Sequence, residues 1–352
     1  MKIKVFGLGP LKKAEIDLKP ITIFLGKNKR GKSYLMRLIY VFLASIYNPS
    51  PENFRIEEKN SKKIILRLLP VNLSKDQIES SERIKFEDIE IPPFKKNEGW
   101  TFKLKIDKEI EKEKFDEEFE KIMEKRLGWR WVLYLPSSRA GLLVSFYPFL
   151  SAWYVYQKAI ASSHPISLRH FLLGINELFS GRGEYELGKF GRIKVEEGEV
   201  YYIENQKKVN FLNAASSIQE LLPILWFLYR EVRKTLIFID EPESHLHPEW
   251  QVELAREMVK NAREKENWFV VSTHSDIFFL ALVNSVLESI KNEKKVIKKE
   301  DVENFLAIYL FGDDGQVEKI EIGKEGISKE QWSKINSELA GKYNDLIQRI
   351  EK

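Results

Sequence analysis

The sequence predicts an α/β fold whose core is a largely parallel β-sheet. Three apolar segments have the length of buried strands, namely Ile21 to Leu25, Leu236 to Ile239 and Trp268 to Ser272. Segments with helical spacing of apolar residues lie between them, and strands that alternate with helices favour a parallel sheet. The chain has 352 residues, enough for about two structural units of roughly 150 residues each.

The composition excludes several classes of protein. With 57 Lys and Arg against 53 Asp and Glu, the net charge is only +4, which excludes a disordered chain and a strongly basic nucleic-acid coat protein. This charge neither demands nor forbids a nucleic-acid partner. The absence of cysteine excludes disulfides, thiolate zinc sites, iron–sulfur clusters and cysteine nucleophiles. A Cys-free chain rich in Lys and Glu also fits a thermophile.

The apolar segments do not predict a membrane protein. The first residues, Met1 to Phe6, lead into a charged, strand-like segment instead of a secretory signal, so we expect a cytoplasmic protein. The longest uncharged stretch, Ala140 to Gln157, has the minimum length of a membrane span. Pro148 and several polar residues interrupt it, which favours a buried helix of a soluble domain and no membrane partner.

Residues 1–50 are expected to form the first part of the core. Ile3 to Phe6 and Ala14 to Leu18 indicate two strands around a glycine-rich turn. A third strand leads into a glycine-bearing loop, and apolar residues from Leu35 to Ile46 then recur at helical spacing. Asn48 and the prolines after it end that helix.

Residues 51–130 are expected to form a charged insertion. Short alternating runs predict antiparallel strands, and a highly charged stretch with one apolar stripe predicts an amphipathic helix. The strands are expected at Lys63 to Leu69, Arg83 to Ile91 and Trp100 to Ile106, and the helix at Asp107 to Arg126.

Residues 131–230 are expected to form a helical subdomain with a hairpin, and residues 231–352 to complete the core. The elements expected here are a strand at Val132 to Leu135, helices to about Phe179, hairpin strands at Arg192 to Val195, Val200 to Ile203 and Val209 to Phe211, and helices at Ile218 to Arg230 and Glu249 to Lys260.

The clearest chemical signal follows the first buried strand. The segment Gly26-Lys27-Asn28-Lys29-Arg30-Gly31-Lys32-Ser33-Tyr34 begins with the phosphate-binding pattern G-x-x-x-x-G-K-[ST]. Its glycines let backbone N–H groups turn inward, and the helix after them directs its positive end at the same anion. We expect Lys32 to reach the β and γ oxygens of a nucleotide and Ser33 to bind Mg²⁺. An ordinary glycine turn is the weaker alternative.

Two carboxylates end the second apolar strand. Parallel strands present such acids at their carboxyl ends, where the ligands of α/β sheets bind. Asp240 is placed to hold Mg²⁺ together with Ser33 or through water, and Glu241 to polarise an attacking water. Taken alone, this pair is also typical of a solvated turn.

A histidine follows the third apolar strand. His274 lies 34 residues after Asp240, where an imidazole can hydrogen-bond a γ-phosphate and report its presence. Taken alone, a histidine at a strand end is more often an ordinary surface or core group.

Together these motifs resemble the ABC-type ATPases of the SMC, RecF and OLD group, and most of all the OLD-like AAA-type ATP-binding proteins. The resemblance rests on the phosphate loop, the run Asp240-Glu241-Pro242-Glu243-Ser244-His245-Leu246-His247-Pro248, Ser272-Thr273-His274-Ser275 and the opening Phe6-Gly7-Leu8-Gly9-Pro10. It implies a P-loop NTPase with an ABC-type head, in which a parallel core sheet joins an antiparallel β subdomain. A long insertion splits such sheets, as residues 34–239 do here.

The resemblance also implies ATP and Mg²⁺ as cofactors and a homodimer of two heads closed by ATP. Ala215 to Glu220 is the best match to the signature segment, whose Ser216 and Ser217 are then expected to meet the γ-phosphate bound by the other subunit. No glycine follows these serines, which departs from the family's pattern. A simple helix N-cap by one serine is compatible with that role.

Other candidates carry less. Leu135 to Gly141 resembles the segment in which other ABC proteins have a magnesium-contacting glutamine, but it contains no glutamine. Arg139 in this segment is a candidate for contact with phosphate or with the signature segment. A plain salt bridge of Arg139 is the alternative. His245 and His247 lack a third ligand nearby, so a metal pair is disfavoured. The dinucleotide fingerprint fails because Lys12 stands where its third glycine belongs.

The motifs and this resemblance together imply an ATPase whose nucleotide-dependent head dimerisation drives a partner. After His274 the acidic pair Asp313-Asp314 lacks the Asp-x-Asp spacing of a Toprim nuclease, so any effector is expected to be a separate protein. The resemblance suggests DNA-related defence or repair. The alternatives are a non-hydrolysing ATP-dependent scaffold and an ABC transporter ATPase subunit.

Overall fold

The computed structural model describes the core of the chain and parts of its insertion. The described residues are 1–47, 54–60, 63–68, 83–86, 89–91, 100–105, 128–150, 171, 175, 178, 181–204, 206–293, 297–323 and 326–327. The helix expected at Asp107 to Arg126 lies outside them, as do most of the residues expected to be helical between 151 and 179.

A six-stranded sheet forms the centre, in the order β17-β16-β3-β15-β14-β9. All neighbouring strands are parallel except β17, which pairs antiparallel with β16. The predicted parallel sheet is thus confirmed, and it draws strands from the first, third and fourth predicted segments. The strands are β3 (Ile21–Leu25), β9 (Trp131–Leu135), β14 (Thr235–Asp240), β15 (Trp268–Ser272), β16 (Leu306–Phe311) and β17 (Val317–Ile320).

Two separate cores cover the two faces of this sheet. Successive side chains of a strand point to opposite faces, and in β14 Ile237 and Ile239 join one core while Leu236 and Phe238 join the other. Because both faces are buried, β14 has no polar alternation, as expected for a parallel strand between layers.

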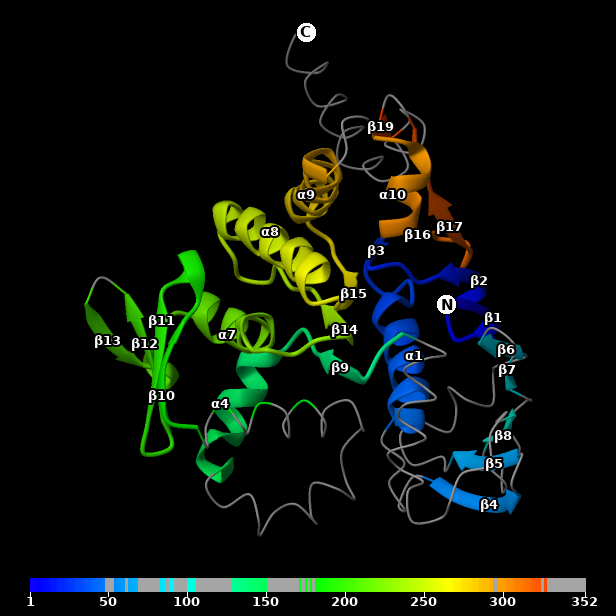
Figure 1. The fold of residues 1–352 in the computed structure, drawn as a ribbon, viewed down its shortest axis with the longest axis horizontal. Coiled ribbons are helices and arrows are strands. Elements are labelled where there is room, and N and C mark those ends of the chain that lie inside the picture. Colours follow the sequence, from blue (N-terminus) through cyan, green and yellow to red (C-terminus); the bar gives the residue numbers. More distant parts are fainter. Residues whose placement is uncertain are drawn as a thin grey trace, which may run out of the picture.

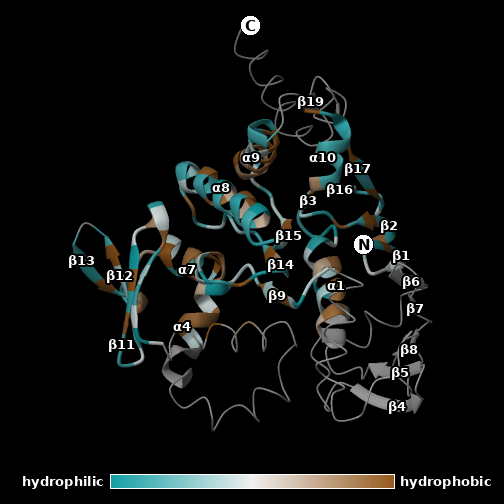
Figure 2. Cartoon of the chain, in the orientation of Figure 1, coloured by the Kyte–Doolittle hydropathy of each residue, from teal (hydrophilic) through white to brown (hydrophobic). Residues whose placement is uncertain are grey.

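Helices form the two outer layers. The core that contains Ile237 also contains residues of α7 (Ser216–Tyr229), α8 (Pro248–Glu264) and α9 (Asp276–Glu293), and the core that contains Phe238 includes α1 (Lys32–Tyr47). These groups lie on different sides of the strands in Figure 1. Figure 2 shows that α7 is largely hydrophobic, whereas α8 is mostly hydrophilic on its outer side. Two further helices are α4 (Arg139–Leu150) and α10 (Lys299–Phe305).

Antiparallel sheets surround the core, as the sequence predicts. One has the order β2-β1-β6-β7, one β4-β5-β8 and one β10-β11-β12-β13, and β18 pairs with β19. Their bounds are β1 (Lys2–Leu8), β2 (Leu11–Asp17), β4 (Phe54–Asn60), β5 (Lys63–Leu68), β6 (Arg83–Phe86), β7 (Ile89–Ile91), β8 (Trp100–Lys105), β10 (Gly183–Glu186), β11 (Arg192–Glu196), β12 (Glu199–Glu204), β13 (Lys207–Asn210), β18 (Ile322–Gly323) and β19 (Gly326–Ile327).

Two strand predictions are wrong. The run Arg83 to Ile91, expected as one strand, forms the two strands β6 and β7, which pair antiparallel with each other. Phe211, expected in the last hairpin strand, begins a short 3₁₀ turn over Phe211–Asn213. The side chain of Asn210 accepts a hydrogen bond from the main-chain N–H of Leu212 and so caps this turn instead of extending the strand.

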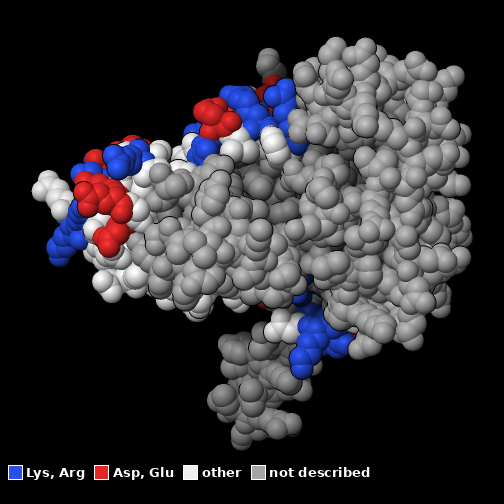
Figure 3. Space-filling model, turned by 90° about the horizontal axis from the view of Figure 1, so that it is seen from below, with Lys and Arg blue, Asp and Glu red and all other residues white. Residues whose placement is uncertain are grey.

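Opposite charges are interleaved on the sheet β10–β13. Figure 3 shows red and blue side chains side by side at the left end of the molecule, where this sheet lies in Figure 1. Arg192 pairs with Glu184 at 2.9 Å, and both Lys194 and Lys208 pair with Glu196.

Among the residues that the structure describes, no helix combines the length and the apolar character needed to cross a membrane. The uncharged stretch that begins at Ala140 enters α4, where Leu143 is fully buried in the core.

Removal of the Phe238 side chain from β14 should lower the stability of the protein strongly. We expect Phe238→Ala to lower the free energy of unfolding by about 3–5 kcal/mol, because the ring is fully buried and its removal leaves a cavity. Urea denaturation measures this loss. The matched control is Trp131→Ala on the neighbouring strand, since Trp131 is 47% exposed and should cost less than half as much. Equal losses would contradict the two-layer core.

Candidate functional site

The phosphate-loop segment connects β3 to α1 at the carboxyl end of the sheet. Gly26 has φ 131° and Gly31 has φ 92°, both in the region that favours glycine. A Cβ at Gly26 would lie 2.6 Å from the main-chain oxygen of Phe311, so no other residue fits between β3 and β16 there. The two glycines of the motif are therefore required by the backbone, as the pattern predicts.

Lys32 begins α1 and its ammonium folds back over the loop. Its Nζ donates hydrogen bonds to the carbonyls of Gly26 at 2.6 Å and Lys27 at 2.9 Å. Burial lowers the pKa of Lys32 to about 8, although the charges of Asp240 and Glu241 oppose this shift. The loop thus holds a desolvated cation where the sequence expects phosphate.

Asp240 ends β14 and lies against Ser33. The Oγ of Ser33 donates to Oδ1 of Asp240 at 2.8 Å, and Ser272 donates to the same oxygen. Tyr134 on β9 reaches the other carboxylate oxygen at 3.3 Å and in turn accepts from Arg37 at 3.3 Å. A hydroxyl and a carboxylate side by side are oxygen donors of the kind that Mg²⁺ prefers.

Glu241 and His274 face each other beside this pair. The Nε2 of His274 lies 3.6 Å from Oε1 of Glu241. Burial, followed by the charge of Lys32, lowers the pKa of His274, which favours the uncharged imidazole. The three predicted strand ends thus bring a carboxylate, an imidazole and a lysine to one place.

Glu243 is a buried member of the site whose contacts the motif alone does not reveal. Its Oε1 accepts hydrogen bonds from the Thr273 hydroxyl at 2.6 Å and from the main-chain N–H of His274 at 3.0 Å. Burial raises the pKa of Glu243. The residue ties the turn after β14 to the loop that carries His274; its place two residues after Glu241 is the only signal for it in the sequence.

The other residues of the segment Gly26 to Tyr34 are exposed or partly exposed on the surface of the loop. Asn28 and Lys29 are exposed, and Asp313 in the β16–β17 turn binds both Lys27 at 3.3 Å and Arg30 at 2.8 Å. These exposed pairs hold the loop against β16 with little energy. Tyr34 is half-buried, with its ring 3.3 Å from the position that a Cβ of Gly9 would take.

Ser216 and Ser217 lie in the first turn of α7. Ser216 is exposed and Ser217 is half-buried. The interpretation of either serine as the N-cap is wrong, because Ala215 occupies that position without a side-chain hydrogen bond. The first-turn N–H groups of a helix lack intrahelical partners, so this end is suited to an anion.

Arg139 does not serve as a phosphate ligand. Its guanidinium is completely buried, and it donates to main-chain carbonyls, among them that of Glu220. Two of the roles considered are found together: contact with the segment Ala215 to Glu220, and a salt bridge, which Arg139 makes with the Glu220 carboxylate at 3.4 Å.

His245 and His247 follow the strand-end carboxylates on the way to α8. Among the described residues no group of three or more His, Cys, Asp or Glu is arranged to hold a metal ion. His245 has φ 62°, a left-handed turn conformation, and His247 is the N-cap residue of α8, so the two belong to the connection between β14 and that helix.

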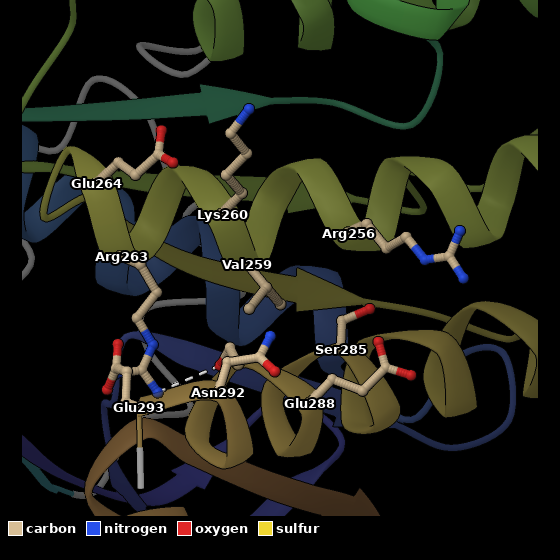
Figure 4. A pocket seen from close by; sticks show the side chains of 10 residues that line it. Arg256, Val259, Lys260, Arg263, Glu264, Ser285, Glu288, Asn292 and Glu293 are labelled. Carbon is tan, nitrogen blue, oxygen red and sulfur yellow. Dashed lines mark hydrogen bonds and ion pairs between the residues drawn. The ribbon is translucent and has the colours of Figure 1, made fainter.

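A hollow lies between α8 and α9 (Figure 4). Its volume is about 330 Å³, and it contains none of the predicted site residues. From α8, Arg256, Lys260, Arg263 and Glu264 line one side, and from α9 Glu288 and Glu293 line the other. Arg263 is already bound to Glu293 at 2.9 Å. Balanced charges of both signs select no class of ligand.

A family model matches more than half of the chain. The family model described as "AAA domain, putative AbiEii toxin, Type IV TA system" matches residues 21–281. No curated protein matches the chain in sequence.

Among solved structures, the SMC head domain from Thermotoga maritima is similar at 12% identity, with a TM-score of 0.43 over 92% of this chain and 98% of that one. An Smc head domain from Pyrococcus furiosus, bound to the C-terminal domain of ScpA, is 12% identical over 100% and 99% of the two chains, with a TM-score of 0.40. The ADP conformation of an ATP-binding cassette of an ABC transporter is 11% identical over 97% and 95%, with a TM-score of 0.38.

The lowered pKa of Lys32 predicts a pH dependence of triphosphate binding. Below pH 8 the amine is protonated and attracts phosphate; as the pH rises through about 8 the free protein loses this charge, so binding then requires uptake of a proton. We expect the Kd for ATP to rise by up to about tenfold per pH unit between pH 8 and 10. Fluorescence titration measures it. Lys32→Ala should bind ATP weakly, with a Kd that does not change with pH in this range. A Kd of the parent protein that is independent of pH between about 8 and 10 would contradict the assignment of Lys32 to phosphate binding.

Proposed function

The chain belongs to the family described as "AAA domain, putative AbiEii toxin, Type IV TA system", and on that premise we propose that it is a Mg²⁺-dependent ATPase. One observation carries the proposal: Ser33, next to the phosphate-loop lysine, touches the β14 carboxylate Asp240 at 2.8 Å. Glu241 and His274 stand beside them, 3.6 Å apart. This is the set of groups that phosphoryl transfer to water needs.

The phosphate loop binds the nucleotide in this proposal. Lys32 exchanges its two carbonyl partners for the β and γ oxygens of ATP, and main-chain N–H groups of the loop Gly26 to Gly31 contact the same phosphates. Ser33 and Asp240 fit Mg²⁺ by their oxygen donors, and the bound ion would neutralise phosphate charge. Lys27, Asn28, Lys29, Arg30 and Tyr34 border the bound nucleotide.

Glu241 acts as the base. Its carboxylate is half-exposed at the carboxyl edge of the sheet, where water has access, and it polarises the water that attacks the γ-phosphate. The ring N–H of His274 donates a hydrogen bond to the γ-phosphate, and Glu241 takes the proton that the attacking water loses. Glu243 holds the backbone of His274 in place for this contact.

Two heads close on ATP in the proposed cycle. The exposed first turn of α7, with Ser216 and Ser217, is available to the γ-phosphate bound by a second copy of the chain. Hydrolysis then reopens the pair. The sequence resemblance supports coupling of this motion to a separate effector protein in DNA-related defence or repair.

Removal of the phosphate-loop ammonium should abolish tight ATP binding. We expect Lys32→Ala to weaken the Kd for ATP by about 100-fold or more, because charge-assisted contacts to two phosphates are lost. Isothermal titration calorimetry measures the Kd, and melting temperature verifies the fold. Lys260→Ala, an exposed charge lost from α8, is the matched control and should leave the Kd unchanged. An ATP affinity equal to the parent's in Lys32→Ala would refute the site.

Neutralisation of Glu241 should trap the ATP state. We expect Glu241→Gln to reduce steady-state turnover by about 100-fold or more while ATP still binds, since the shape remains and the base is lost. The variant should therefore accumulate as a dimer with ATP and dissociate with ADP, as followed by light scattering.

Ser217→Arg in the Glu241→Gln background is the control for closure. It places bulk at the first turn of α7 and should prevent dimerisation without changing the ATP affinity of one head. An oligomeric state indifferent to nucleotide would reject the face-to-face cycle. No turnover in the parent protein would reject hydrolysis and favour the ATP-dependent scaffold.

A further inference from the structure

We propose that Arg139 is a positioning residue that locks the Asp240-Glu241 turn to the first turns of α7, so that the base and the Ser216-Ser217 segment move as one unit. The inference deepens the proposed ATPase function and rests on it for the roles of Glu241 and α7. Its physical basis lies in the contacts of one buried guanidinium.

The guanidinium of Arg139 joins three segments of the chain. Its Nη1 donates to the carbonyls of Pro136 at 2.7 Å and Asp240 at 2.8 Å. Its Nη2 donates to the carbonyl of Glu241 at 3.1 Å, and its Nε donates to the carbonyl of Glu220 at 3.0 Å. The end of β9, the turn after β14 and helix α7 therefore share a single cation that has no access to solvent.

Only an arginine can make this set of bonds. The guanidinium is planar and carries five N–H donors in a fixed fork, so it reaches acceptors on three sides at once. A buried cation without such partners is strongly destabilising, because its desolvation is not compensated. The four carbonyl partners of Arg139 are thus the condition under which the charge stays buried.

The turn that Arg139 holds has a strained backbone. Glu241 has φ 49°, a left-handed conformation that non-glycine residues adopt at a cost. The guanidinium binds the carbonyls on both sides of this residue's N–Cα bond, those of Asp240 and Glu241. The N–H of Glu241 also donates to the carbonyl of Ser272 at 3.0 Å. These bonds fix the direction in which the Glu241 carboxylate leaves the turn.

The other end of the connection is Glu220 in α7. Besides its carbonyl, its carboxylate lies 3.4 Å from Nε of Arg139, and both side chains are buried. The pair therefore neutralises the charge of Arg139 inside the protein. Glu220 lies three residues after Ser217, about one helical turn from the exposed end of α7.

The connection gives the proposed cycle a direct mechanical path. A ligand that displaces the N-terminal end of α7 also displaces Glu220, and Arg139 transmits this displacement to the carbonyls of Asp240 and Glu241. The base is then aligned by engagement of α7.

The test compares Arg139→Lys with the parent protein. Lysine keeps the charge but lacks the fork, so ATP turnover should fall by about tenfold or more while the Kd for ATP changes less than about twofold. In the Glu241→Gln background, Arg139→Lys should cause no further loss of single-turnover rate, because it acts through Glu241. Independent losses in the two backgrounds, or unchanged turnover, would overturn the proposal.

Amide hydrogen exchange provides a readout that does not depend on hydrolysis. Arg139→Lys should speed exchange at both Glu241 to Leu246 and the first turns of α7, and leave β10–β13 unchanged. Unchanged protection at either segment would overturn the coupling, even in a parent protein that proved to hydrolyse no ATP. A parent protein that hydrolyses no ATP would by itself reject only the proposed enzymatic function.

Lys265→Met supplies the matched control. Lys265 also donates to main-chain carbonyls of the α7 region, those of Leu228 at 2.9 Å and Arg230 at 2.5 Å, but at the helix's opposite end. Its loss should loosen only that end and leave turnover within about twofold. If Arg139→Lys fails to fold, Glu220→Gln tests the same connection. It keeps the shape of the side chain and the main-chain carbonyl that accepts from Arg139, but it removes the counter-charge. Amide exchange should then be faster both at Glu241 to Leu246 and in the first turns of α7.

Discussion

The parallel register of β3, β15 and β14 is the constraint on which the site depends. Phe24 lies opposite Ser272, and Ser272 lies opposite Asp240. All three strands therefore reach their carboxyl ends at the same height, and the residues that follow them meet there. Without this alignment the contact between Ser33 and Asp240, which are 207 positions apart in the chain, would not form.

Several charged side chains of the site are buried, and each is stabilised by opposite charges or carbonyl groups around it. Lys32 loses hydration, which lowers its pKa to about 8, yet the carboxylates of Asp240, Glu241 and Glu243 oppose the shift. Arg139 is compensated from the other side of the same turn by four carbonyls and by Glu220. Cations on both sides of the turn after β14 are therefore stabilised by its carboxylates and carbonyls, and these contacts hold the turn in its conformation.

The motifs that the sequence reveals are those whose geometry is local. The phosphate loop places its glycines, lysine and serine through a short stretch of backbone, so eight contiguous residues suffice to predict it. The strand-end carboxylates and His274 were predicted for a similar reason: each follows an apolar strand directly. The structure brings these three predicted groups together, while Ser216 and Ser217 occupy a helix end whose predicted partner belongs to a second copy.

The sequence by itself determined the α/β class, the phosphate loop and the strand-end carboxylates, because periodicity and contiguous motifs encode them. Only the tertiary structure decided the partners of Tyr134, Arg139 and Glu243, whose bonds span 106, 101 and 30 positions along the chain. It also replaced the expected serine cap of α7 by Ala215. Such contacts depend on which strands become neighbours, and a one-dimensional pattern does not specify strand order. A buried arginine and a surface arginine are identical in sequence until the fold supplies the surrounding carbonyls.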